Sequence, residues 1–262
     1  MQILVCVKRV PDTSENEIKI DAAGNDIDRD DFVYSINEAD NYAVEEALQL
    51  VDRVGGEVTA VTVGEEEDEE VLRREMAMGA KHAVLISDDS FRGSDSRGIA
   101  EILSAYVRNN HFDLILTGVQ AEDGAAQVGG MLAALLDYPF ASLVTSIEVL
   151  PDHKLKVYRE IEGGTKEIHE IDLPCVLSIQ TGINEPRYVG MRGIRQVASL
   201  EIPVLGASNL GLNGGSAGTA SAKVTRLDYF IPPQGGAEML RGSRDQIIET
   251  LIEMMRSKGA LA

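Results

Sequence analysis

The regular alternation of short apolar runs with amphipathic segments constrains the fold of this chain more than any other feature. Apolar runs of strand length occur at residues 3–7, 57–63, 82–86 and 112–116. Between them, apolar side chains recur at helical spacing over residues 41–54, 71–78 and 99–106. Strands that alternate with helices are typical of a parallel sheet with helices on both faces. We therefore expect an α/β fold built on an open, mostly parallel sheet.

The second half of the chain is expected to extend this sheet with antiparallel strands. Four strand-like segments with short connections lie at residues 142–149, 154–161, 166–173 and 176–180. Gly163 and Gly164 predict a tight turn between two of them.

The last third of the chain predicts a loop, an arm and a terminal helix. Residues 184–200 are expected to form a loop followed by a helix. Residues 206–222 are rich in glycine, serine and alanine and lack the apolar content to pack alone, so they form a linker or an arm laid over a partner. The final helix carries an apolar stripe made of Ile247, Ile248, Leu251, Ile252 and Met255. We expect a nucleotide-binding domain at residues 1–205, which includes a partner-recognition loop at residues 184–195. At residues 206–262 we expect an arm and helix that dock on another chain.

Residues 112–136 read as a buried strand, a glycine-rich turn and a helix. The unpaired N–H groups at such a junction carry partial positive charge and suit an anion, typically a phosphate. Gly124, Gly129 and Gly130 let the backbone approach that anion closely. Glu122 and Asp123 would repel a phosphate, so we expect them to face a hydroxyl, an amide or solvent. The alternative is an ordinary turn of the kind that joins many strand–helix units.

The turns after Val7, Val63 and Leu116 are expected to share one crevice, because ligands of open parallel sheets bind beyond the carboxyl ends of the strands. The chain offers little chemistry of its own there. Its four histidines are scattered without metal-ligand spacing, and the nucleophile elbow, the Walker lysine loop and GxGxxG are absent from the sequence. We therefore expect a nucleotide- and partner-binding protein, not an enzyme, and no metal site.

Net charge limits the partners that the chain can bind, and its cysteine content indicates the redox state of its compartment. The chain has 24 Lys and Arg against 43 Asp and Glu, a net charge of −19, which argues against binding to nucleic acid or an anionic membrane. Cys6 and Cys175 lie in apolar runs and are expected to be buried thiols, as in a reducing compartment. No run reaches the roughly 20 apolar residues of a membrane-spanning helix. With no signal-peptide pattern at its start, the protein is expected to be cytoplasmic.

Five motifs together resemble one known family. They are CVKRVPD at residues 6–12, AVEEAL at 43–48, AMGA at 77–80, GVQAEDGAAQVG at 118–129 and NEPRY at 184–188. In order and spacing they are similar to the electron-transfer flavoprotein beta subunit, from Met1 to about residue 200 and more loosely to the C-terminal helix.

The resemblance implies an open, flavodoxin-like α/β fold that holds an adenine nucleotide. It also implies a heterodimer with an alpha subunit, which makes most of the contacts to a redox-active FAD. Such a dimer takes electrons from flavin dehydrogenases, such as acyl-CoA dehydrogenases, and passes them to a membrane quinone oxidoreductase or another acceptor.

The resemblance also implies site residues in this chain. The base and ribose of the nucleotide are expected at Cys6, Asn37, Glu38, Ala39, Asp40 and Val63. The phosphate is expected at the loop made of Gly118, Val119, Gln120, Ala121, Asp123, Gly124, Ala125, Ala126, Gln127 and Val128. Partner dehydrogenases are expected at Asn184, Glu185, Pro186, Arg187, Tyr188 and, as the apolar anchor, Met191.

The family divides into a branch that binds AMP as a structural ligand and a branch that binds a second FAD and bifurcates electrons. The CVKRVPDT start and the DG and AQVG parts of the loop resemble the bifurcating branch, but Ala125 stands where that branch has an acidic residue. The NEADNYAVEEAL segment resembles the AMP branch. The loop is also one residue shorter between Gly118 and Gly129 than in the commoner form, which leaves the phosphate contacts open. We favour AMP.

Two other classes share the expected fold. An adenine-nucleotide sensor of the universal-stress type would not need NEPRY or residues 184–262. An ATP-using ligase would need a pyrophosphate loop of the SGGxDS kind, which the sequence lacks.

Overall fold

The structure, a computed structural model, describes residues 1–262 except 25, 30, 122–123, 213–214, 216, 225–226, 234, 238 and 262. It divides into two compact units. The larger consists of Met1–Lys19 and Asp28–Arg226, and the smaller of Ile20–Ile27 and Leu227–Ala262. The functional division expected at residue 206 stays a prediction.

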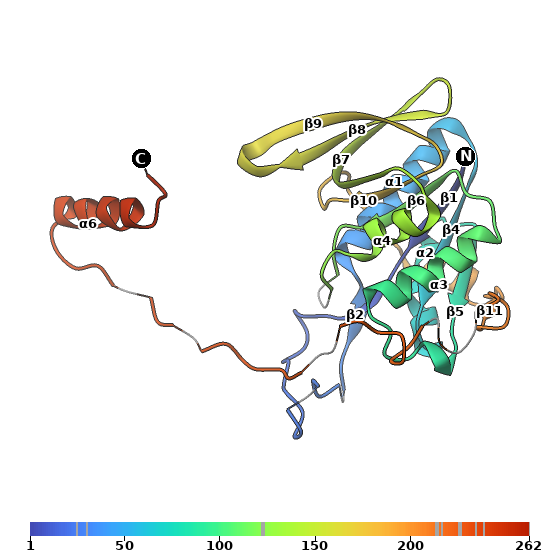
Figure 1. Ribbon diagram of the computed structural model, residues 1–262, viewed down its shortest axis with the longest axis horizontal. Helices are drawn as coiled ribbons and strands as arrows, with labels where there is room; N and C mark the ends of the chain where they lie inside the picture. The colour runs from blue at the N-terminus through green and yellow to red at the C-terminus, as the bar shows by residue number, and fades with distance from the viewer. Residues whose placement is uncertain are drawn as a thin grey trace. The chain divides into compact units, whose positions relative to one another are not determined.

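The larger unit is built on a nine-stranded sheet in the order β11-β5-β4-β1-β6-β10-β7-β8-β9 (Figure 1). The strands are β1 (Gln2–Cys6), β4 (Glu57–Val63), β5 (His82–Ile86), β6 (Leu114–Gly118), β7 (Phe140–Leu150), β8 (Lys154–Ile161), β9 (Thr165–Asp172), β10 (Cys175–Ile179) and β11 (Val204–Leu205). The strands from β11 to β7 pair in parallel, whereas β7–β8 and β8–β9 pair in antiparallel fashion. The expected open, mostly parallel α/β sheet with an antiparallel extension is thereby confirmed.

The strand expected at residues 176–180 was assigned to the wrong part of the sheet. It is β10, which lies between β6 and β7 and runs parallel to both. All five of its residues, CVLSI, are buried. A strand covered on both faces reads as a continuous apolar run, while a half-exposed antiparallel strand alternates. That difference was present in the sequence and marks β10 as a central strand.

Helices cover both faces of the sheet, and two apolar clusters form the core. The helices of this unit are α1 (Glu38–Val54), α2 (Glu69–Met78), α3 (Ser96–Arg108), α4 (Val128–Leu136) and the short α5 (Met191–Val197). Val44 of α1 and Leu72 of α2 pack with Val5 in one cluster. Ile102 of α3 and Leu132 of α4 pack with Leu4 in the other. Because neighbouring residues of β1 enter opposite clusters, the two faces are filled by alternate side chains of each strand.

The segment after α5 packs within the larger unit. β11 pairs in parallel with β5, and Leu210 and Ala217 are buried in the cluster around α3. A small two-stranded sheet of β2 (Arg9–Pro11) and β3 (Tyr34–Ile36) also belongs to this unit.

The smaller unit contains an isolated bridge between Ile20 and Ile27 and the helix α6 (Arg244–Ser257). The Ser243 hydroxyl accepts a hydrogen bond from the N–H of Gln246, and the Gln246 side chain accepts one from the N–H of Ser243, a reciprocal cap that fixes the start of α6. The predicted apolar stripe of this helix is exposed at Ile248, Leu251 and Met255. None of the helices in the part of the chain that the structure describes has the length and apolar character that a bilayer crossing requires.

Candidate nucleotide-binding site

A cavity of about 320 Å³ lies at the carboxyl ends of β1, β4 and β6. The chain runs from β1 outward to β4 and β5, and then crosses to the other side of β1 to form β6. Such a switch in strand order separates the loops that follow the strands, and it is the usual ligand position in open α/β sheets. The first turns of α1, α3 and α4 complete the walls.

Most of the residues expected to hold the nucleotide line this one cavity. They are Cys6, Asn37, Asp40, Val63, Gly118, Val119, Gln120, Ala121, Gly124, Ala125, Ala126, Gln127 and Val128. Two of the expected residues, Glu38 and Ala39, are not among the lining residues: the side chain of Ala39 is buried, and Glu38 is exposed. Asp123 lies outside the described residues, as does Glu122.

Asp40 connects the two strand ends that frame the cavity. One carboxylate oxygen of Asp40 accepts the N–H of Lys8, 2.9 Å away, and the other accepts the N–H of Gly118, 3.0 Å away. The amide of Asn37 donates to the carbonyl oxygen of Gln120 at 3.0 Å, which ties the loop after β6 to the start of α1. Burial raises the pKa of Asp40 to about 7, although hydrogen bonds to its ionised form oppose the rise.

Two of the glycines at the cavity are required by the packing around them. A Cβ atom at Gly118 would lie 2.3 Å from an Asp40 carboxylate oxygen, so Gly118 is needed for the Asp40 contact. A Cβ atom at Gly129 would lie 2.6 Å from the Ser178 hydroxyl and 2.9 Å from that of Thr117. Gly129 therefore lets α4 rest on the sheet, and its expected role in making room for a phosphate stays a prediction. At Gly124 a Cβ atom would meet nothing closer than 3.6 Å.

Sequence reasoning missed the wall formed by the start of α3. Ser94, Asp95 and Ser96 line the cavity there, together with Lys8 after β1. The Asp95 side chain caps α3 by accepting the N–H of Gly98 at 2.9 Å. An aspartate before a helical apolar pattern is a helix-start signal, so this helix terminus was recognisable, although its place in the cavity wall beside the loop after β6 was not. The remaining lining residues are Val7, Val61, Ile99, Leu103, Thr117 and Gly129.

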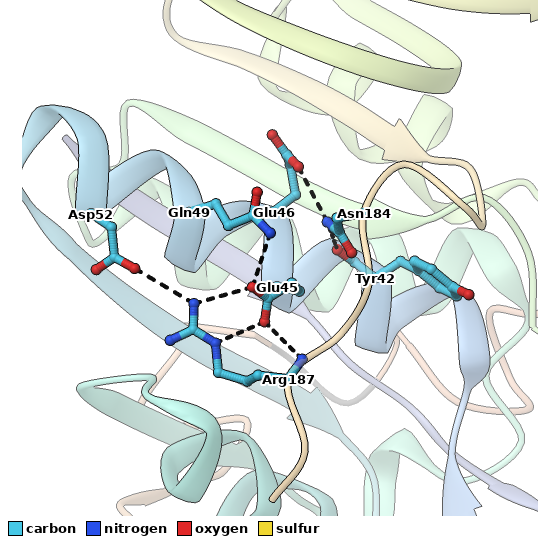
Figure 2. Close-up of polar contacts among 7 residues, drawn as sticks. All are labelled: Tyr42, Glu45, Glu46, Gln49, Asp52, Asn184 and Arg187. Atoms are coloured by element: carbon cyan, nitrogen blue, oxygen red, sulfur yellow. Dashed lines mark hydrogen bonds and ion pairs between the residues drawn. The ribbon is translucent and has the colours of Figure 1, made fainter.

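The expected partner-recognition residues divide into an inward and an outward set. Asn184 and Arg187 contact α1 (Figure 2). Tyr188 is 92 % exposed and Met191 is 65 % exposed. Glu185 is exposed and Pro186 is half-buried.

Comparison with known proteins gives the family. Residues 26–210 match the electron transfer flavoprotein domain family. The chain is 35 % identical over 265 residues to electron transfer flavoprotein subunit beta of Methylophilus methylotrophus, covering 99 % of this chain and 100 % of that protein. It is 36 % identical to electron transfer flavoprotein subunit beta of Bacillus subtilis, covering 98 % of each chain. It is also 35 % identical to the caffeyl-CoA reductase-Etf complex subunit CarD of Acetobacterium woodii, covering 98 % of this chain and 99 % of that protein.

The near-complete coverage of these relatives accounts for the C-terminal arm and helix as well as the domain itself. A universal-stress sensor or an ATP-using ligase is thereby set aside. The chain belongs to the electron transfer flavoprotein family, as a beta subunit.

Proposed function

We propose that this chain pairs with an electron transfer flavoprotein alpha subunit, carries electrons from flavin dehydrogenases such as acyl-CoA dehydrogenases to a quinone oxidoreductase or other acceptor, and holds AMP in its cavity. The observation that carries the proposal is the cavity at the strand switch, lined by most of the residues that family resemblance assigns to an adenine nucleotide. In this proposal FAD is held mainly by the alpha subunit. This chain acts as an electron-carrier subunit without catalytic side chains of its own.

The charge around the cavity favours a nucleotide with one phosphate. The sequence between Gly118 and Leu136 contains no lysine or arginine. Among the described lining residues the cation is Lys8, while Asp40 and Asp95 bring carboxyl groups. Further phosphates would depend on backbone N–H groups and on a helix dipole worth about 0.3–1 kcal/mol when exposed. A volume of about 320 Å³, at the lower end for small-molecule sites, also suits a mononucleotide.

The alternative is a second FAD in this chain, as in electron-bifurcating members of the family. A further cavity of about 460 Å³ shares Val63, Ser94 and Ile99 with the first and contains Arg92, so the two together offer room for a longer ligand. Two relatives carry names of CoA-ester reductase systems, CarD and the acryloyl-CoA reductase electron transfer subunit gamma of Anaerotignum propionicum.

The redox role is tested by the heterodimer with its alpha subunit. In anaerobic stopped-flow measurements, a substrate-reduced acyl-CoA dehydrogenase should bleach the flavin absorbance of the heterodimer, and a quinone oxidoreductase should restore it. The carrier role would be refuted if no flavin dehydrogenase tested reduced the heterodimer's flavin while dithionite reduced it fully.

Met191 tests the docking surface separately. It is a flexible apolar side chain exposed at the start of α5, of the kind that adapts to several partner surfaces. Met191→Ala should slow reduction by the dehydrogenase by roughly tenfold with unchanged FAD content. A wild-type rate with the natural donor would contradict the anchor role.

A further inference from the structure

Residues 184–200, here called the recognition segment, are held at their first end by a buried carboxylate on α1. The Glu45 carboxylate accepts two bonds from the Arg187 guanidinium, from Nε at 2.8 Å and from Nη2 at 3.1 Å (Figure 2). It also accepts the backbone N–H of Arg187 at 3.1 Å. A forked pair of this kind fixes orientation as well as distance.

Neighbouring side chains of α1 complete this first anchor. The Glu45 side chain is only 5 % exposed, and Gln49 donates to its Oε1 at 3.0 Å. The Asn184 amide donates to the Tyr42 carbonyl oxygen at 3.1 Å and to Glu46 Oε2 at 3.2 Å. Burial raises the pKa of Glu45, but hydrogen bonds from Arg187 and Gln49 outweigh it and hold that pKa below its usual value, so Glu45 is ionised at neutral pH.

The second end of the segment is held by an arginine of α2. Arg73 Nη1 donates to the carbonyl oxygens of Val197 at 3.0 Å, Ala198 at 3.1 Å and Leu200 at 3.1 Å. The last carbonyls of a helix lack partners within it, so Arg73 caps α5 from outside. Glu69, one turn earlier on α2, pairs with the other side of the Arg73 guanidinium.

Between the two anchors, the segment presents apolar side chains outward. Tyr188 is 92 %, Met191 65 % and Ile194 37 % exposed. Binding residues on loops work best when a rigid scaffold positions the loop in advance.

We propose that Glu45 and Arg73 are positioning residues that hold the recognition segment ready to dock a flavin dehydrogenase. The proposal rests on the docking role given to this segment under the proposed function. It assigns no partner contact to Glu45 or Arg73, and it gives Asn184 and Arg187 an internal contact with α1.

The order of the segment is measured first, by hydrogen exchange with mass spectrometry on the heterodimer. Glu45→Gln and Arg73→Gln should each speed amide exchange in residues 184–200 by roughly tenfold, a local opening without loss of the fold. The control is Glu101→Gln, which removes a carboxylate that pairs with Arg97 on the surface of α3. The proposal would be overturned if amide exchange in residues 184–200 of the two anchor variants were no faster than in that control.

Docking is measured in the same variants by steady-state reduction with an acyl-CoA dehydrogenase. KM for the dehydrogenase should rise by roughly tenfold while kcat and FAD content stay near the control, because a mispositioned surface weakens encounter rather than chemistry. If Met191→Ala raises KM and the two anchor variants do not, the positioning role is refuted and the docking role stands. If none of the three changes KM, the docking role itself fails and the proposal fails with it.

Discussion

Two buried carboxyl groups, Asp40 and Glu75, differ in how their oxygen atoms are hydrogen-bonded. Asp40 is satisfied by backbone N–H groups at the cavity. Both carboxyl oxygens of Glu75 are buried, and neither has a hydrogen-bond partner among the described residues. The first positions a site, whereas the second is a cost to the folded state.

Asp40→Asn should destabilise the protein and empty its cavity. The substitution places an NH₂ group opposite one of the N–H donors, and an unsatisfied buried group costs about 1–3 kcal/mol. The free energy of unfolding and the AMP content of the purified heterodimer should therefore both fall relative to the wild type.

The control is Asp113→Asn, because Asp113 accepts the N–H of Gln2 at 2.6 Å, at the opposite end of β1. Asp113→Asn should lower stability and retain AMP. Equal AMP retention in both variants would contradict the role given to Asp40.

Glu75 should make stability fall as pH rises. Burial raises its pKa from 4.5 to about 8, with a smaller contribution from Asp40. The folded state therefore binds a proton at Glu75 more tightly than the unfolded state does. The stability that this proton contributes to the folded state is fully present below about pH 4.5 and is lost as pH rises to about 8.

Glu75→Gln removes this titration, so its free energy of unfolding should decline less than that of the wild type over the same pH range. Urea unfolding across the range measures the difference, with the exposed Glu66→Gln as control. A pH slope equal to that of the wild type would show that Glu75 does not titrate there.

At the scale of elements, the sequence predicts individual strands and helices better than it predicts which of them lie side by side. Periodicity found β1, β4, β5 and β6 and the helices between them, because each strand or helix carries its own pattern. It misplaced β10, because the segment was grouped with its neighbours by their short connections, although its continuous apolar run indicated a central strand. It also missed Lys8 and Ser94 as cavity residues, since their proximity arises only when the sheet forms.

The segment 206–222 shows the same limit. Its composition predicts a linker or arm, and a few apolar side chains decide its packing: Leu210 and Ala217 are buried in the cluster around α3. Burial of two such side chains is invisible in an average over the segment.

Removal of the smaller unit's C-terminal part tests docking of α6 on the alpha subunit. A chain that ends before Leu227 keeps Leu210 and Ala217 in the core and loses α6, whose Ile248, Leu251 and Met255 are exposed. We expect the shortened chain to fold but to associate with the alpha subunit at least about tenfold more weakly, as large apolar contacts dominate such interfaces. Analytical ultracentrifugation measures it, and an unchanged dimer would refute docking through α6.

At the scale of the whole molecule, α1 joins the two surfaces to which function is assigned. Asn37 and Asp40 at its start belong to the cavity, and Glu45 lies five residues after Asp40, roughly 7 Å along the axis. The recognition segment is thereby held at a fixed distance from the nucleotide cavity, on one rigid helix.

The proposed function requires that the cavity holds AMP and that the heterodimer carries one redox flavin. Acid extraction of the purified heterodimer, followed by chromatography of the released nucleotides, tests it most directly. We expect about one AMP and one FAD per heterodimer, since the charge and size of the cavity favour a single phosphate. Two FAD and no AMP per heterodimer would contradict it and establish the bifurcating alternative.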